Sequence, residues 1–434
     1  MSFLILGLWL LATVPAAAEE PVVQDVLDIL KDRGLVDDGQ YTALSAKNLA
    51  YEEEQQGLLG RIEWSGDFRG RFENFWYDRD EAGTRRDDRH RLRYRLRVQG
   101  KAEINEYIDA VFRFASGEAV NFDEGANRST NRTLGRSRDF NMNALFIDRA
   151  YLDIHTPDDW IDGAKAQVLF GKVPNPFRWK IGKDLILWDG DINPEGVAAR
   201  FSYDVDESWN LFLNTGYFIA DENSTDADPH VYGIQGGVHG DLSEDWHVGA
   251  RASFYSWRSL NEAYFGRSER FGTIEDGLTS DAPTRGASNF RVVEVGGYIR
   301  YDAVEGWPVL LYGHWVQNLD AVGSDLFPAA GKEDTAWGIG IEAGDKKHLA
   351  AIGVGYYEIE ANAWPAQFLD SDITDGFSNR GGWHVYGKRQ ILPNTDFSVE
   401  LLWSDPVRTS LPDFETSVAN SERIRLRTDV IVKF

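Results

Sequence analysis

The stretch RHRLRYRLRV, residues 89–98, places an arginine at every second position and mostly apolar residues between them. Arginine is always charged and donates several N–H groups, so a row of arginines attracts anions and does not transfer protons. Because side chains alternate between the two faces of a β-strand, all these arginines share one face. The chemistry therefore requires a strand with water on one side and an apolar medium on the other. The arginines are Arg89, Arg91, Arg93, Arg95 and Arg97.

The overall composition excludes several classes of function. With 70 acidic and 45 basic residues the net charge is −25, so phosphate would be repelled by most of the surface and no nucleic-acid partner is expected. The chain has no cysteine, which excludes disulfides, thiolate zinc sites and a cysteine nucleophile. Mean hydropathy is −0.40, and beyond residue 20 no apolar run is long enough for a membrane helix.

The N-terminus predicts export. Residues 1–18 combine an apolar core with a small-residue end, AAA, as in a secretory signal peptide cleaved after about Ala18. In the following segment, 19–58, apolar residues recur at helical spacing from Val23 to Leu30, and Gly34 is placed to end that helix. Asp37 or Asp38 could cap a second helix. A helical hairpin used in self-association and a disordered acidic tether both remain open.

From Gly60 onward the apolar period changes from 3.6 to 2, which predicts β-strands throughout residues 59–434. We count sixteen such segments, with no helical periodicity between them. Their connections alternate between short turns and long polar loops, as in a transmembrane antiparallel β-barrel and unlike a soluble sandwich. Four tryptophans adjoin short turns and suit an aromatic girdle at the membrane surface: Trp160, Trp209, Trp246 and Trp307.

The chain ends in RIRLRTDVIVKF, whose apolar residues again alternate up to Phe434. A terminal strand closing on an aromatic residue resembles the assembly signal of bacterial outer-membrane barrels. The same strand carries a second row of arginines, Arg423, Arg425 and Arg427. Closure of a barrel brings the last strand beside the first, which lies beside the second, so these arginines would join the row in 89–97.

The barrel assigns the arginines to its interior, because a lipid-facing arginine at the bilayer midplane costs about 2–4 kcal/mol. Sixteen strands about 4.8 Å apart enclose a lumen on the order of 30 Å across, too wide for wall side chains to fill. We therefore expect a water-filled channel with a basic wall and a preference for anions. The alternative is that a carboxylate neutralises each arginine and the pairs only brace the wall.

Two stretches, GKVPNPF (171–177) and LWDGDINPEG (187–196), resemble the putative porin family of Gram-negative outer membranes. VAARFSY (197–203) and AYLDI (150–154) fit the same resemblance. It implies a β-barrel porin for passive diffusion of small hydrophilic solutes, without identifying a substrate. The segment before the barrel is also similar to those that precede some phosphate- and anion-selective porins.

The third long loop, 174–195, would fold into the lumen as it commonly does in porins. It carries four acids that would face the basic wall and set up a transverse field: Asp184, Asp189, Asp191 and Glu195. The spacing in DGDINPEG suggests an EF-hand, but Pro194 and Arg200 occupy positions that require glycine and glutamate. We expect no metal or cofactor, although a looser cation site in this loop remains an alternative.

Two other functions compete with the channel. A barrel enzyme would need a base and a nucleophile or paired acids at one rim, but the histidines are scattered and GxSxG does not occur. A surface-binding barrel, or one specific for a polysaccharide or similar solute, is compatible with the long loop 258–289. Expected partners are outer-membrane lipid, lipopolysaccharide, the barrel-assembly machinery and the solutes. The oligomeric state is open, and a homotrimer is common among porins.

Overall fold

The computed structural model describes most of the chain and divides it into two units, Met1–Glu63 and Trp64–Phe434. The described residues are 23–55, 62–77, 88–117, 129–135, 142–157, 160–179, 181–182, 187–222, 224, 227–260, 290–321, 331–374, 378–408 and 422–434. The expected signal peptide, residues 1–18, lies outside them.

The N-terminal unit contains two helices, α1 (Val23–Asp32) and α2 (Asp38–Gln55), which confirms helix over a disordered tether. Gly34 ends α1 with a φ of +67°, and the next N–H, of Leu35, donates back to the carbonyl of Leu30 at 2.9 Å. Asp37 caps α2: its carboxylate accepts from the Gln40 N–H, while the Gln40 side chain accepts from the Asp37 N–H. No described helix is long and apolar enough to cross a bilayer.

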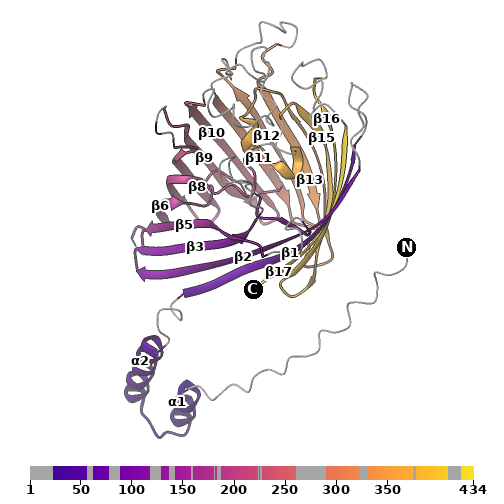
Figure 1. The fold of residues 1–434 in the computed structure, drawn as a ribbon. Helices are drawn as coiled ribbons and strands as arrows, with labels where there is room; N and C mark the ends of the chain where they lie inside the picture. The colour runs from indigo at the N-terminus through magenta and orange to yellow at the C-terminus, as the bar shows by residue number, and fades with distance from the viewer. Residues whose placement is uncertain are drawn as a thin grey trace, which may run out of the picture. The chain divides into compact units, whose positions relative to one another are not determined.

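The second unit is a closed antiparallel barrel of sixteen strands, as the alternation predicted (Figure 1). A further two-residue strand, β4, pairs with β2 and brings the sheet to seventeen. The strands are β1 (Ile62–Tyr77), β2 (Arg89–Asn105), β3 (Ile108–Ser116), β4 (Arg132–Thr133), β5 (Leu145–His155), β6 (Ala164–Lys172), β7 (Glu195–Asp204), β8 (Trp209–Ile219), β9 (His230–Ser243), β10 (Trp246–Arg258), β11 (Arg291–Tyr301), β12 (Val309–Asn318), β13 (Thr335–Ala343), β14 (Ala351–Ile359), β15 (Arg380–Leu392), β16 (Thr395–Pro406) and β17 (Arg423–Lys433).

The barrel closes where β17 pairs with β1 over eleven residue pairs, from Asp67 opposite Lys433 to Tyr77 opposite Arg423. Next to the pair of Asp67 and Lys433, the N–H of Phe434 donates to the carbonyl of Gly66 at 3.1 Å, and the Gly66 N–H donates back at 2.8 Å. A side chain at position 66 would collide with the Phe434 ring. The C-terminal aromatic residue therefore completes the seam between first and last strands.

The outer face of the barrel carries exposed apolar side chains between two groups of tryptophans. Trp160, Trp246 and Trp307, beside short turns, are exposed, as the girdle requires. A second group, which the sequence analysis missed, lies at the strand ends next to the long loops. It comprises Trp76, Trp315, Trp337, Trp383 and Trp403, all exposed. Two aromatic groups with an apolar zone between them are typical of a membrane-spanning barrel.

The connection between β14 and β15 contains two single helical turns, η2 (Ala366–Phe368) and α5 (Ser371–Thr374). The expectation that no helix interrupts the strands is wrong here, because a single turn is too short to show a 3.6-residue period. Residues of both turns are buried against side chains of the wall, so this connection folds into the barrel.

Candidate functional site

Besides Arg89, nine arginines cover the inner faces of three neighbouring strands, β17, β1 and β2, which lie side by side (Figure 1). On β2 the alternation is clear, since Leu92 is exposed while Arg93 and Arg95 are buried. Arg89 begins β2 in the same register. We call the following set the basic wall: Arg69, Arg71, Arg91, Arg93, Arg95, Arg97, Arg423, Arg425 and Arg427.

Carboxylates from the adjacent strands are shared among these arginines. Asp67 on β1 accepts from Arg95 and from Arg97, each at 2.6 Å. Glu73, also on β1 and fully buried, contacts both Arg91 and Arg425. Along the arginine row, residues 89–97, the β2 face has no acid, and β1 supplies the carboxylates that this stretch lacks.

The last strands contribute further pairs. Arg71 binds Asp429 of β17 through two nitrogens, at 2.7 and 2.8 Å, and Arg427 contacts Glu400 of β16. The two-point pair of Arg71 and Asp429 holds both partners in a fixed orientation. The neutralising arrangement raised as an alternative is therefore present in part, but each of Asp67 and Glu73 serves more than one arginine.

One loop carboxylate, Asp372 of α5, also contacts the basic wall. Its oxygens lie 2.6 Å from Arg427, 3.0 Å from Arg71 and 3.1 Å from Arg425. Burial alone would raise the pKa of Asp372, but the three guanidinium groups outweigh that effect and hold the pKa well below its usual range. No local sequence signal marked this residue, because loops have no period that fixes the direction of a side chain.

A second loop segment, 129–135, also reaches the basic wall. Asn131 accepts from Arg69 through its side chain and from Arg93 through its carbonyl, the latter at 3.2 Å. Thr130 binds the carboxylate of Asp191 in the third loop, through its N–H at 3.2 Å and its hydroxyl at 3.1 Å. Segment 129–135 thus links the basic wall to the third loop.

The four third-loop acids are placed differently from one another. Asp184 lies outside the described residues. Asp189 is buried, and its carboxylate accepts from the N–H groups of Asp191 at 2.8 Å and Ser371 at 3.0 Å. Asp191 binds Thr130, and Glu195 pairs with Lys172 across the β6–β7 hairpin at 2.6 Å.

Asp189 has an environment opposite to that of Asp372. Burial and the nearby charge of Asp191 raise the pKa of Asp189, against the opposing hydrogen bonds from backbone groups. Asp189 also donates its own N–H to the carbonyl of Phe368 at 2.9 Å. It therefore ties the third loop to the η2–α5 segment.

Two groups of possible metal ligands are found among the described residues. Asp189, Asp191 and Asn193, the residues with EF-hand spacing, bond to different partners, and Asn193 binds Asp148 and Arg149. Elsewhere Asp109, Asp153 and His155 place their ligand atoms within 4.8 Å of one another. The ammonium of Lys101 lies 3.0 Å from Asp109 and supplies positive charge there.

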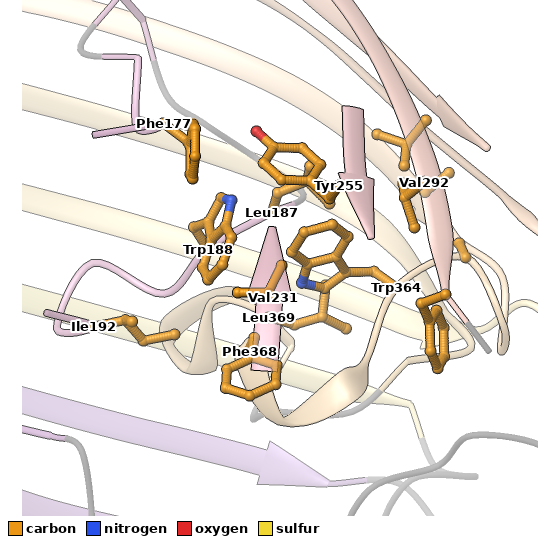
Figure 2. Close-up of a cluster of buried hydrophobic side chains, with 14 of the residues drawn as sticks. Phe177, Leu187, Trp188, Ile192, Val231, Tyr255, Val292, Trp364, Phe368 and Leu369 are labelled. Carbon is orange, nitrogen blue, oxygen red and sulfur yellow. The ribbon is translucent and has the colours of Figure 1, made fainter. Parts of the chain in front are cut away.

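An apolar cluster rich in aromatic rings lies inside the barrel and contrasts with the charged basic wall (Figure 2). We call it the aromatic cluster. Trp188 of the third loop packs on Trp364 of the β14–β15 connection, with ring centres 5.2 Å apart. Phe368 of η2 stacks on Trp257 of β10 at 4.3 Å. Figure 2 also shows Phe177, Leu187, Ile192, Val231, Tyr255, Val292 and Leu369 gathered around these rings.

The start of the third loop is fastened to the wall on this side. The side chain of Gln235 on β9 donates to the carbonyl of Phe177 at 3.0 Å. The guanidinium of Arg251 lies 4.7 Å from the ring centre of Trp179, and it pairs with buried Glu294 at 2.6 Å. The expected inward folding of the loop thus rests on aromatic packing and two buried polar contacts.

Two cavities adjoin these inward segments. One of about 1250 Å³ lies near the short turns, and carboxylates including Asp204, Asp241 and Glu342 line it together with Arg300 and Lys388. The other, of about 890 Å³, is lined by Trp188, Trp257 and Phe368 of the aromatic cluster and by carboxylates of the third loop.

Comparison with known proteins agrees with this architecture. A model of the putative porin family matches residues 78–276. OprB of Pseudomonas putida is 9% identical with a TM-score of 0.51, and the match covers 88% of this chain and 97% of that one. At this identity the likeness concerns the fold.

Two further solved structures are among those that are similar to this chain. The outer membrane channel DcaP of Acinetobacter baumannii is 11% identical with a TM-score of 0.48, over 86% of this chain and 97% of that one. A mutant porin of Rhodopseudomonas blastica is 12% identical with a TM-score of 0.42, over 86% of this chain and 100% of that one. No curated protein sequence matches the chain.

The family expected from GKVPNPF and LWDGDINPEG is thereby confirmed, since both stretches lie within the matched residues. Residues 78–276 carry the sequence of the putative porin family, and the barrel unit has the fold of a bacterial outer-membrane porin.

Proposed function

We propose that this porin is a passive diffusion channel for small hydrophilic solutes and not an enzyme. The observation that carries the proposal is a closed sixteen-strand wall that is apolar outside and charged inside, with polar cavities beside inward-folded loops. A wall of this kind separates lipid from water, and the inward loops restrict the size of what passes.

We further propose that the channel prefers anions at its narrow part. This proposal is supported by the sharing of carboxylates among the arginines of the basic wall: Arg95 and Arg97 both pair with Asp67. Charge at a constriction acts on a permeating ion more strongly than charge around a wide cavity, because less water screens it. The carboxylates around the larger cavity would concentrate cations there without setting the selectivity.

Location and partners belong to the same proposal. Residues 1–18 would be a signal peptide removed on export, and 19–58 a periplasmic segment ahead of the barrel, 59–434. Phe434 would be read by the barrel-assembly machinery, and the apolar zone would contact lipid and lipopolysaccharide. Exposure of Phe434 at the seam between β17 and β1 is consistent with such recognition. We also propose a homotrimer, and its test is the mass of the detergent-solubilised protein.

Pore formation is tested by liposome swelling with neutral solutes. Purified protein should admit small sugars and exclude large oligosaccharides. Vesicles that stay impermeable to every solute, with protein inserted as a heat-modifiable band, would contradict the channel.

The anion preference is tested at two partly exposed arginines of the β2 row. Arg97 and Arg91 retain 22% and 17% of their side-chain exposure, so ions can reach them. Arg97→Ser, and more strongly the double variant with Arg91→Ser, should shift the reversal potential in a salt gradient toward cations. The matched control is Arg291→Ser, which removes an exposed arginine outside the basic wall. Equal shifts in Arg97→Ser and Arg291→Ser would show that only net charge matters.

A further inference from the structure

Asp372 occupies a setting that resembles a bound solute more than a structural ion pair. Three guanidinium groups from two neighbouring strands, those of Arg71, Arg425 and Arg427, converge on its two oxygens at 2.6–3.1 Å. The arginine side chains are 1–5% exposed, whereas that of Asp372 is 31% exposed. The carboxylate thus covers the arginines while its own outer side remains open to solvent.

The segment that carries Asp372 is held in place by other contacts. The N–H of Ser371 donates to Asp189 at 3.0 Å, and the carbonyl of Ile373 accepts from Tyr357 at 3.3 Å and from Arg423. Ile373 is buried in the aromatic cluster. Because these contacts do not involve the Asp372 side chain, its carboxylate can leave the arginines while the backbone stays where it is.

We infer that Arg71, Arg425 and Arg427 form a binding site for the carboxylate group of organic-acid solutes, occupied by Asp372 when no solute is bound. The inference rests on the proposed channel function and names one class of its solutes. Guanidinium groups bind carboxylates by charge-assisted hydrogen bonds. In this site one nitrogen of Arg71 donates to both oxygens of Asp372, at 3.0 and 3.1 Å, while Arg425 contacts one oxygen and Arg427 the other. A solute would enter from the solvent-exposed side of Asp372, and its two carboxylate oxygens would take the places of the two Asp372 oxygens.

The charge around the site favours a carboxylate over a phosphate. Glu73, Glu400 and Asp429 contact the same three arginines, so the site carries little net positive charge once Asp372 moves away. A dianionic phosphate would gain little more from a nearly neutral site than a monoanion does, but it costs more to remove from water, because that cost grows with the square of the charge. Modest net charge also allows release, which conduction requires.

The test compares Asp372→Asn with Asp320→Asn. Each variant removes one carboxylate from an arginine pair, but Asp320 pairs with exposed Arg291 outside the basic wall. If Asp372 occupies the site about nine-tenths of the time, its removal should lower the half-blocking concentration of acetate about tenfold in single-channel currents. Asp320→Asn should behave as the wild type does, and acetamide, the neutral analogue, should block neither variant.

Inorganic phosphate is the second probe. If Asp372→Asn lowers the half-blocking concentration of phosphate as much as that of acetate, the assignment to carboxylates is overturned. If Asp372→Asn and Asp320→Asn lower the half-blocking concentration of acetate equally, the site itself is overturned. Acetate binding to the detergent-solubilised protein, followed by saturation-transfer NMR, gives the same comparison without conduction. Absence of wild-type channels would contradict the proposed function, whereas acetate binding unchanged by Asp372→Asn would contradict the site.

Discussion

The two sides of the barrel interior hold the inward loops by different physical means. On the side of β17, β1 and β2, a buried guanidinium array holds Asp372 of α5 by charge. On the side of β9 and β10, rings of Trp257 and Tyr255 hold Trp364 and Phe368 by packing. The same β14–β15 connection takes part in both contacts, only a few residues apart.

The difference bears on what a solute can change. An ion pair can be exchanged for a dissolved ion of the same charge, and salt weakens it where water reaches it. An aromatic contact has no equivalent competitor in water, and its strength scarcely depends on salt. We therefore regard the aromatic cluster as the fixed support and the basic wall as the part that responds to solutes.

The largest effect is expected on the aromatic side. Trp364 is fully buried and touches the rings of Trp188, Tyr255 and Trp257. Trp364→Ala should lower the free energy of unfolding by about 5 kcal/mol, the upper end for a large buried ring, and should raise single-channel conductance. Urea titration of the folded band measures the first effect. Unchanged conductance with the full loss of stability would mean that the connection does not narrow the channel.

A smaller loss is expected from the charged side. Glu73 is fully buried against Arg91 and Arg425, so Glu73→Gln leaves these arginines without their shared charge. Glutamine keeps the shape of the side chain and can still accept hydrogen bonds. We therefore expect the free energy of unfolding to fall by about 3 kcal/mol, the lower end for a broken buried ion pair. The control Glu195→Gln breaks an exposed pair with Lys172 and should cost less than about 1 kcal/mol. Equal costs would remove the distinction between the basic wall and ordinary surface pairs.

Salt should separate the two sides without any mutation. Raising KCl from 0.1 to 1 M shortens the screening length from about 10 Å to about 3 Å. The anion preference should therefore fall, while the stability lost in Trp364→Ala should stay the same. If the stability lost in Trp364→Ala varies with salt as steeply as the anion preference does, the aromatic side also depends on charge.

The smallest effect concerns pH. A carboxyl whose folded pKa is raised stabilises the fold fully below its ordinary pKa and loses that contribution as pH rises through the raised value. Acidification should therefore stabilise the buried position of Asp189, because protonation removes a buried charge that is repelled by Asp191, and should reduce conductance fluctuations from the third loop. The pKa of Asp372 is lowered, so its charge should persist over the same range. Asp189→Asn should abolish the pH dependence of the fluctuations, and a dependence that survives would assign it elsewhere.

The sequence predicted the features that follow from the two-residue period of β-strands: the positions of the strands and the faces to which their side chains point. Alternation located the sixteen strands and put Leu92 and Arg93 on opposite faces, because an apolar outside and a charged inside impose a period of two. Closure of the first and last strands followed from the even count. The second group of tryptophans could have been found by the same alternation near the long loops.

The part that sequence did not predict lies in the connections. No local feature of the sequence indicates that the side chain of Asp372 contacts Arg71, which lies 301 positions away along the chain. The third loop was expected to direct its acids at the basic wall, whereas Asp189 binds backbone groups and Asp191 binds Thr130. Such placements result from the packing of two loops against each other, as between Trp188 and Trp364, which has no counterpart in the spacing of either loop.

The most direct test of the central claim is the reversal potential of single wild-type channels in a salt gradient at low ionic strength. A water-filled pore whose narrow part adjoins the basic wall should conduct anions in preference to cations, with the preference reduced in Arg97→Ser and kept in Arg291→Ser. A cation preference in the wild type would contradict the account. It would mean that the carboxylates around the larger cavity govern the path and that the arginines only brace the wall.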